Sequence, residues 1–149
     1  MIGHLIEKGF EDITAFGALG FYLIITIFAL LLGEGILALK LFLALILILF
    51  IIFIIRYFYR KPRPGEKIDN TNVLTIIDSG SFISVHAARV IVLVFLLMPF
   101  FDRTILIFFW IVAILVISSR IVLKKHYITD IILGIIFGLV VYFLVNIVH

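Results

Sequence analysis

The sequence has 149 residues, of which 65% are hydrophobic and 14% charged, with a net charge of +3 and a mean hydropathy of +1.38. A soluble domain carries about 25% charged residues, so this composition excludes an ordinary water-soluble domain and indicates a lipid environment. The absence of cysteine excludes disulfides, thiolate catalysis and zinc–cysteine centres. The small net charge argues against nucleic acid as a partner.

The N-terminal region predicts a short interfacial helix followed by two membrane-spanning helices. Residues 1–12 place apolar and charged side chains at helical spacing, which is typical of an amphipathic helix in the membrane interface. The apolar run from Ile13 to Leu32 lacks the basic region and cleavage site of a signal peptide, so we expect it in the mature chain. A second run extends from Ile36 to Ile55, with Lys40 placed to snorkel.

One extended polar segment, residues 56–83, separates these runs from three further ones at 84–101, 104–120 and 127–148. Each is near the roughly 20 residues that cross a hydrocarbon core, and backbone groups in lipid require helices. The sequence therefore predicts an all-α polytopic membrane bundle of about five transmembrane helices plus the N-terminal interfacial helix. We expect one domain over residues 1–149, with 56–83 as a polar active-site loop that includes a short surface or re-entrant helix.

Five alternating spans place the polar segments 1–12, 56–83 and 120–126 on one side of the membrane. Lys and Arg residues also concentrate on this side, which by the positive-inside rule alone would be cytoplasmic. The rule counts every basic residue as a topology signal, so it is less informative where some of the arginines bind substrate phosphate. The basic residues expected on this side are Lys8, Arg56, Arg60, Lys61, Arg63, Lys67, Arg120, Lys124 and Lys125, against Lys40 and Arg103 opposite.

Three clusters of polar residues fall on that same side. Ionisable residues at membrane helices are costly, so two histidines, an aspartate and three arginines converging on one face indicate a functional site. Taken singly, each has a simpler explanation as a headgroup anchor or a structural residue. The clusters are Arg56-x6-Arg63-Pro64, Ser84-Val85-His86, and Ser119-Arg120-x5-His126-x3-Asp130.

The residue types in these clusters are those of phosphoryl transfer. Asp130, four residues after His126, can accept a hydrogen bond from one ring nitrogen and leave the other as a nucleophile. Ser84 suits a helix N-cap, and the free N–H groups of that helix N-terminus bind anions. His86, in the first turn, is placed to protonate a leaving oxygen.

Guanidinium groups provide the positive charge that a phosphoryl group requires. Arg56, Arg63 and Arg120 can neutralise its oxygens, and the sequence has no acidic cluster for a metal, so we expect no metal or other cofactor. Arg89 lies three residues after His86, so it can face the site and contact a second phosphate or a headgroup, with snorkelling to the interface as the alternative. Lys124 and Lys125 are expected to contact headgroups.

Together the clusters resemble the signature motifs of the type-two phosphatidic acid phosphatase superfamily, the lipid phosphate phosphatases, which read Lys-x6-Arg-Pro, Pro-Ser-Gly-His and Ser-Arg-x5-His-x3-Asp. The resemblance implies metal-independent hydrolysis of a lipid phosphate or diphosphate at the outer face of a prokaryotic cell membrane. It implies a phosphohistidine at His126, oriented by Asp130, with His86 protonating the leaving group. The phosphate would be held by Arg56, Arg63, Ser84, the Val85 backbone and Arg120.

Two departures from the family pattern bear on activity. Arg56 replaces the family lysine, and Ile83-Ser84-Val85-His86 stands in place of Pro-Ser-Gly-His. A branched side chain excludes the positive φ that glycine permits, so we expect a helical backbone at Val85 with its N–H available.

These departures leave two alternatives open beside hydrolysis. One is a phosphotransferase that passes the phosphoryl group to a lipid or sugar, and the other is a non-catalytic protein that binds anionic lipids. The sequence leaves open the lipid anchor, which ranges from a polyprenyl diphosphate to phosphatidate, and it also leaves open the oligomeric state.

Overall fold

The computed structural model describes residues 2–147, with side chains from residue 7 onward. Its regular structure is helical throughout that range, apart from one isolated bridge between Pro62 and Gly80, which confirms the all-α prediction. The elements in chain order are α1 (Ile2–Thr14), η1 (Ala15–Gly17), α2 (Leu19–Leu31), α3 (Gly35–Phe58), α4 (Val73–Ser79), α5 (Val85–Leu97), η2 (Met98–Phe100), α6 (Arg103–Val122) and α7 (Ile128–Val145).

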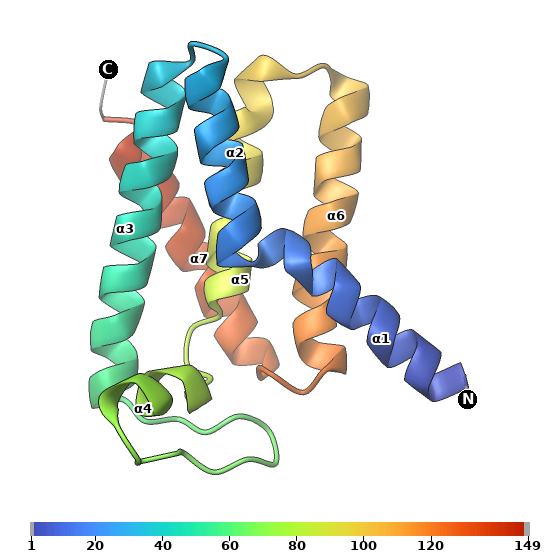
Figure 1. Cartoon of the computed structure of the whole chain (residues 1–149), viewed down its shortest axis with the longest axis vertical. Coiled ribbons are helices and arrows are strands. Elements are labelled where there is room, and N and C mark those ends of the chain that lie inside the picture. Colours follow the sequence, from blue (N-terminus) through green and yellow to red (C-terminus); the bar gives the residue numbers. More distant parts are fainter. Residues whose placement is uncertain (1, 148–149) are drawn as a thin grey trace.

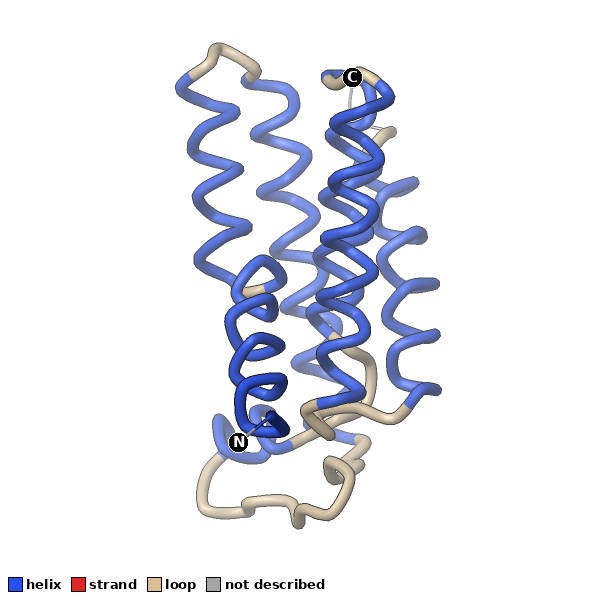
Figure 2. The backbone as a smooth tube through the Cα atoms, turned by 90° about the vertical axis from the view of Figure 1, so that its right-hand side faces the viewer, coloured by secondary structure: helices blue, strands red, loops and turns tan. Residues whose placement is uncertain are grey.

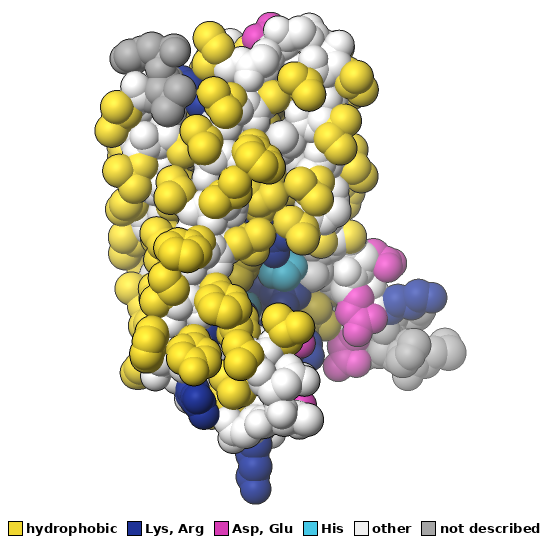
Figure 3. Space-filling view, turned by 60° about the vertical axis from the view of Figure 1, so that its left-hand side comes forward, with side chains coloured by type: hydrophobic (Ala, Val, Ile, Leu, Met, Phe, Trp, Pro, Cys, Tyr) yellow, Lys and Arg dark blue, Asp and Glu magenta, His cyan; other side chains and the backbone are white. Residues whose placement is uncertain are grey.

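The apolar helices make the chain an integral membrane protein. Four segments are long and apolar enough to cross a bilayer: Glu7–Leu31, Gly35–Phe58, Arg103–Val122 and Ile128–Val145. A shorter apolar helix, Val85–Phe100, lies where the sequence predicts the third span. Exposed Leu, Ile and Phe side chains cover the flank of the bundle, and charged side chains gather towards one end (Figure 3).

The first predicted span is interrupted, which the sequence does not predict. The helix expected from Ile13 to Leu32 breaks at η1, so that α1 leaves the bundle at an angle while α2 continues along it (Figure 1). A Cβ atom on buried Gly17 would lie 2.6 Å from Val116 Cγ1, so only glycine permits this close contact with α6. The charged residues of α1 from residue 7 onward are exposed, and its place in the membrane interface stays a prediction.

Helix α5 is the centre of the bundle and packs against α3, α6 and α7. Ten of its 13 residues are buried. Its contact with α7 depends on two glycines four residues apart, since Cβ atoms on Gly134 and Gly138 would lie 2.7 Å from the carbonyl oxygens of Ser84 and Ala88. Small residues of this kind allow membrane helices to approach closely. The N-terminus of α7 is thereby held against that of α5.

The polar connections lie together at one end of the bundle, as the sequence predicts (Figures 1 and 2). This site end consists of α4, the loop 59–72 and the connection 123–127. The opposite end holds the α2–α3 turn, η2 and the C-terminal end of α7. Helix α3 continues three residues beyond the predicted end at Ile55, so Arg56 lies in its last turn. Helix α4 confirms the short helix expected within the polar loop, and Asn72 caps it.

Candidate active site

Arg56 connects the end of α3 to the segment that leads into α5. Its side chain is buried, and all three of its nitrogens donate hydrogen bonds to carbonyl oxygens. Nε donates to Phe82 at 3.2 Å, Nη1 to Ile77 at 3.1 Å and Nη2 to Ile83 at 3.0 Å. A lysine could not make this set of contacts, because it lacks the planar fork of donors. Arg56 therefore shapes the segment that precedes the α5 N-terminus.

The segment entering α5 adopts an unusual backbone conformation. Ile83 has φ of 57°, a left-handed value that is rare for a β-branched residue, whereas Val85 begins α5 with a negative φ. The expected helical backbone at Val85 is thus confirmed. Ser84 is the N-cap as predicted, since its Oγ accepts a hydrogen bond from Ala87 N at 3.4 Å. The N–H groups of Val85 and His86 have no acceptor within residues 2–147.

His126 lies in the connection between α6 and α7 and is 5% exposed. Its Nδ1 is 2.8 Å from the carbonyl oxygen of Ser81, so Nδ1–H is the donor and Nε2 of the neutral ring carries the lone pair. Burial lowers the pKa of His126 to about 4, with the positive charges of Arg56 and Arg120 acting in the same direction against Ser81 and Asp130. The ring is therefore neutral near pH 7.

Asp130 does not make the hydrogen bond to His126 that its spacing predicts. Its Oδ1 lies 2.5 Å from Lys61 Nζ, and its Oδ2 accepts a hydrogen bond from Tyr127 N at 3.1 Å. The i, i+4 argument requires both residues on one helix, but α7 begins at Ile128, after His126. Asp130 is instead the third residue of α7 and caps its N-terminus. The carbonyl of Ser81 takes the expected role of fixing the tautomer of His126.

His86 occupies the first turn of α5, where η1 and α6 close over it. A Cβ on Gly17 would meet its Cδ2 at 2.9 Å, so the ring is held against the η1 backbone. Neither ring nitrogen has a hydrogen-bond partner in the described part of the chain. Arg120 and His126 both lie within electrostatic reach of the ring. The structure thus brings the two predicted histidines and the third-motif arginine to one region.

Several guanidinium nitrogens in this region are buried without an acceptor. They are Nε of Arg63, Nε and Nη1 of Arg89, and Nε of Arg120. The other contacts of Arg63 and Arg120 leave these atoms unpaired, since Arg63 donates to the Asp78 carbonyl and Arg120 Nη1 to Thr14 Oγ1 at 3.4 Å. A buried donor without a partner costs about 1–3 kcal/mol. Four such atoms in one region indicate a site for an anion.

The approach to His126 is open at the site end. A pocket of about 500 Å³ is lined by Lys61, His126 and Tyr127 among others. In Figure 3, a histidine and several Lys or Arg side chains lie at the bottom of a hollow in the apolar flank. Lys124 is exposed and also lines this pocket, whereas Lys125 Nζ lies 3.6 Å from a carboxylate oxygen of Glu66.

The sequence did not predict a role in the site for five residues that contribute to this region. Most act through backbone atoms or close packing, which carry no spacing signal. Lys61 lies two residues before Arg63, a place where a headgroup anchor is equally expected. The missed residues are Thr14, Gly17, Lys61, Ser81 and Tyr127.

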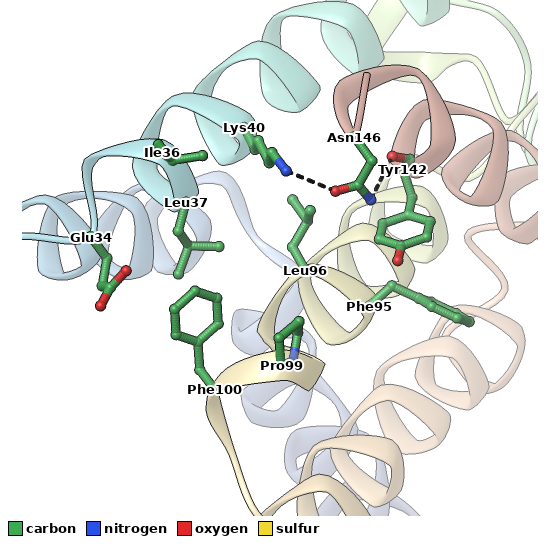
Figure 4. Close-up of a pocket in the computed structure, with 10 residues that line it drawn as sticks. All are labelled: Glu34, Ile36, Leu37, Lys40, Phe95, Leu96, Pro99, Phe100, Tyr142 and Asn146. Atoms are coloured by element: carbon green, nitrogen blue, oxygen red, sulfur yellow. Dashed lines mark hydrogen bonds between the residues drawn. The ribbon is translucent and has the colours of Figure 1, made fainter. Parts of the chain in front are cut away.

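A second pocket, of about 320 Å³, lies at the opposite end of the bundle (Figure 4). Lys40 Nζ donates to Asn146 Oδ1 at 3.0 Å there, and Asn146 Nδ2 donates to the Tyr142 carbonyl at 3.2 Å. Among the residues that the structure describes, no histidine or arginine lines it. Lys40 is therefore held by a neutral amide, and this pocket lacks the groups for phosphoryl chemistry.

The fold and the site define a polytopic helical membrane protein with two histidines and a group of arginines near one membrane face. The family model of the PAP2 superfamily matches residues 37–149, more than half of the sequence, so the chain belongs to this superfamily. No curated protein matches the chain. Among solved structures, LpxE of Aquifex aeolicus has the same fold, with a TM-score of 0.78 at 20% identity over 95% of this chain and 86% of that one.

Proposed function

We propose that this protein is a membrane phosphatase that hydrolyses a lipid phosphate or diphosphate through a phosphohistidine at His126. The observation that carries the proposal is a neutral imidazole, with its lone pair on Nε2, beside buried guanidinium donors that lack an acceptor. Membership of the PAP2 superfamily and the three spaced motifs support it. Arginines bind phosphate oxygens in planar, paired geometry, which suits this set of donors.

In the first step, Nε2 of His126 attacks phosphorus and the bond between phosphorus and the lipid oxygen breaks. His86, protonated in the substrate complex, donates this proton to the departing oxygen and becomes neutral, since it lies in the first turn of α5 with unpaired ring nitrogens. The products are a free lipid alcohol, or a lipid monophosphate, and phosphorylated His126. The N–H groups of Val85 and His86 bind phosphate oxygens at the helix N-terminus.

In the second step, a water molecule attacks the phosphohistidine. His86, now neutral, accepts the proton of that water, the N–P bond breaks and inorganic phosphate leaves. The neutral form of His126 is thereby regenerated. Each histidine returns to its starting protonation state, so the cycle consumes one water molecule for each phosphate released.

The remaining charged residues divide into binding and positioning groups. Arg63 and Arg120 hold the phosphoryl oxygens, because each has a buried nitrogen without a partner. Arg56 and Asp130 are positioning residues, since Arg56 binds the carbonyls before α5 and the Asp130 carbonyl accepts the Ser84 N–H at 2.9 Å. We propose that these guanidinium groups supply the positive charge of the site, so that no metal is needed.

A lipid substrate fits the place of the site in the bundle. The histidines lie near the site end, and the flank around the hollow is covered by apolar side chains that face hydrocarbon (Figure 3). A phosphate on an apolar anchor reaches such a site with its chains still in the bilayer. We place this end at the outer face of the cell membrane, on the motif resemblance.

The test is release of inorganic phosphate by the detergent-purified protein from a panel of lipid phosphates, with EDTA present. We expect turnover that survives EDTA and falls by at least about a thousandfold in His126→Ala, because loss of a nucleophile removes the covalent route. Lys67→Ala, an exposed cation of the same loop, is the matched control and should retain wild-type rates. Unchanged phosphate release by His126→Ala would contradict the proposal. Labelled lipid with an added alcohol acceptor distinguishes hydrolysis from transfer.

A further inference from the structure

Arg89 is a buried cation that the proposed cycle does not use. Its side chain is 6% exposed, and no carboxylate lies within ion-pair distance among the described residues. Both Nε and Nη1 are buried without a hydrogen-bond partner. An unpaired charge in a membrane bundle is expensive, and such residues mark pathways or binding sites for charged ligands. Arg89 therefore requires an anion that this part of the chain does not supply.

The position of Arg89 relative to His86 indicates which part of a bound substrate would contact Arg89. The two residues are three apart on α5, so they share one face, with Arg89 about 4.5 Å farther from the site end. Arg89 also lies within electrostatic reach of Arg120 and of Tyr22 on α2, which places it in the bundle interior. His86 protonates the leaving oxygen in the proposed cycle. Arg89 thus lies beyond that oxygen, on the side of the leaving group.

The charges of the site agree with a ligand of more than one phosphate. The buried arginines are Arg56, Arg89 and Arg120, while the one buried carboxylate, Asp130, is neutralised by Lys61. A phosphate monoester carries a charge of about −2 near pH 7. A second phosphate adds a further negative charge and two more oxygens, which are the acceptors that Arg89 lacks.

We propose that Arg89 forms a second anion subsite that binds the phosphate of the leaving group, so that the preferred substrate is a lipid diphosphate. This inference rests on the proposed function of the same site. Nε2 of His126 attacks the terminal phosphorus, the bond between that phosphorus and the bridging oxygen breaks, and the lipid monophosphate leaves bound to Arg89. Water then releases inorganic phosphate from His126. One diphosphate and one water give one lipid monophosphate and one phosphate.

The test compares a polyprenyl monophosphate with the diphosphate of the same chain length, in wild type and Arg89→Met. Charge-assisted hydrogen bonds are worth about 1.5–3 kcal/mol, so we expect kcat/KM for the diphosphate to fall about 10–100-fold. The value for the monophosphate should change less than about threefold. Equal losses on both lipids, or no loss on the diphosphate, would overturn the inference. The control is Arg60→Met, since Arg60 is exposed and contacts the side chain of Asn70.

Two further readouts separate this inference from the proposed function. Turnover of the monophosphate alone, abolished in His126→Ala, would uphold the phosphatase and overturn the diphosphate subsite. Binding of the diphosphate to His126→Ala, compared with His126→Ala/Arg89→Met, tests the subsite without any turnover. We expect the double variant to bind at least tenfold more weakly, and equal affinity would overturn the proposal. Arg89→Met should also unfold at a higher temperature without ligand, because it removes an uncompensated buried charge.

Discussion

Lys61 Nζ lies 2.5 Å from Oδ1 of Asp130, and this ion pair joins the loop after α3 to the first turn of α7. The Asp130 side chain is fully buried, whereas Lys61 is about a quarter exposed. The lysine ammonium also lies 4.5 Å from the centre of the Tyr127 ring, which attracts it further. The pair therefore fixes both sides of the opening that leads to His126.

Removing Lys61 should destabilise the protein more than its surface position indicates. Lys61→Met leaves the Asp130 carboxylate buried without its cation, and breaking one side of such a pair costs about 3 kcal/mol. We expect a lower thermal unfolding midpoint in detergent and reduced phosphate release. Lys67→Met, at an exposed position of the same loop, should match wild type. The double variant Lys61→Met/Asp130→Asn should recover part of the stability, and equal midpoints for Lys61→Met and wild type would contradict the role of the pair.

Replacing Ile83 by the proline of the family motif should reduce activity and stability, whereas replacing Val85 by the glycine of that motif should change activity little. Ile83 has φ of 57°, whereas proline is held near −65°, so Ile83→Pro must rearrange the carbonyl that Arg56 binds. We expect at least about a tenfold loss of phosphate release and a lower unfolding midpoint, since strain at such positions is worth about 1–3 kcal/mol. Val85→Gly, at a negative φ, should change activity less than threefold. An active and stable Ile83→Pro would show that this backbone conformation is not needed.

Enlarging Gly134 should separate α7 from α5. The added Cβ of Gly134→Ala would lie 2.7 Å from the Ser84 carbonyl oxygen, and that backbone atom cannot move aside cheaply. Overpacking of this kind costs about 1–3 kcal/mol. We expect a lower unfolding midpoint together with lost activity, because Ser84 caps the helix that binds phosphate. The matched control is Gly20→Ala, where a Cβ meets nothing within 4 Å and stability should be kept. Equal effects of the two substitutions would contradict the contact.

The pKa of the His126 ring should lie below the usual range for histidine. Its pKa is lowered to about 4, so the ring stays neutral from pH 8 down to about 5 and gains a proton only as the pH falls through 4. The measurement is the ¹³C chemical shift of the His126 ring in His86→Gln protein, assigned by difference from the variant that also carries His126→Ala. A midpoint near 4 agrees with burial against the arginines. A midpoint between 6 and 7 would show an open, solvated ring instead.

The sequence predicts most of the fold and the principal groups of the site for identifiable reasons. Long apolar runs determine the spans, and the spacing of His126, His86 and Arg120 around them places these groups at one end. The break at Gly17 was missed because the apolar run continues through it, and the reason lies in a contact with Val116 far away in the chain. Hydropathy records burial in lipid and says nothing of such tertiary contacts.

The details of the site depend on partners that spacing does not reveal. The partner of Asp130 was predicted wrongly, because α7 begins two residues after His126 and its N-cap takes the carboxylate. The orientation of His126 depends on the Ser81 carbonyl, and backbone acceptors leave no mark in a sequence. Arg89 was expected to contact a second phosphate or a headgroup, or to snorkel to the interface. Its full burial follows from the central position of α5, which only the packing of the helices determines.

The covalent intermediate is the most direct test of the central claim. Detergent-purified protein is mixed with a ³²P-labelled lipid phosphate, quenched after milliseconds in base, where phosphohistidine persists, and mapped by mass spectrometry. We predict label on His126 in wild type and none in His126→Ala. Rapid phosphate release without any label on His126, or with label on another residue, would contradict the account.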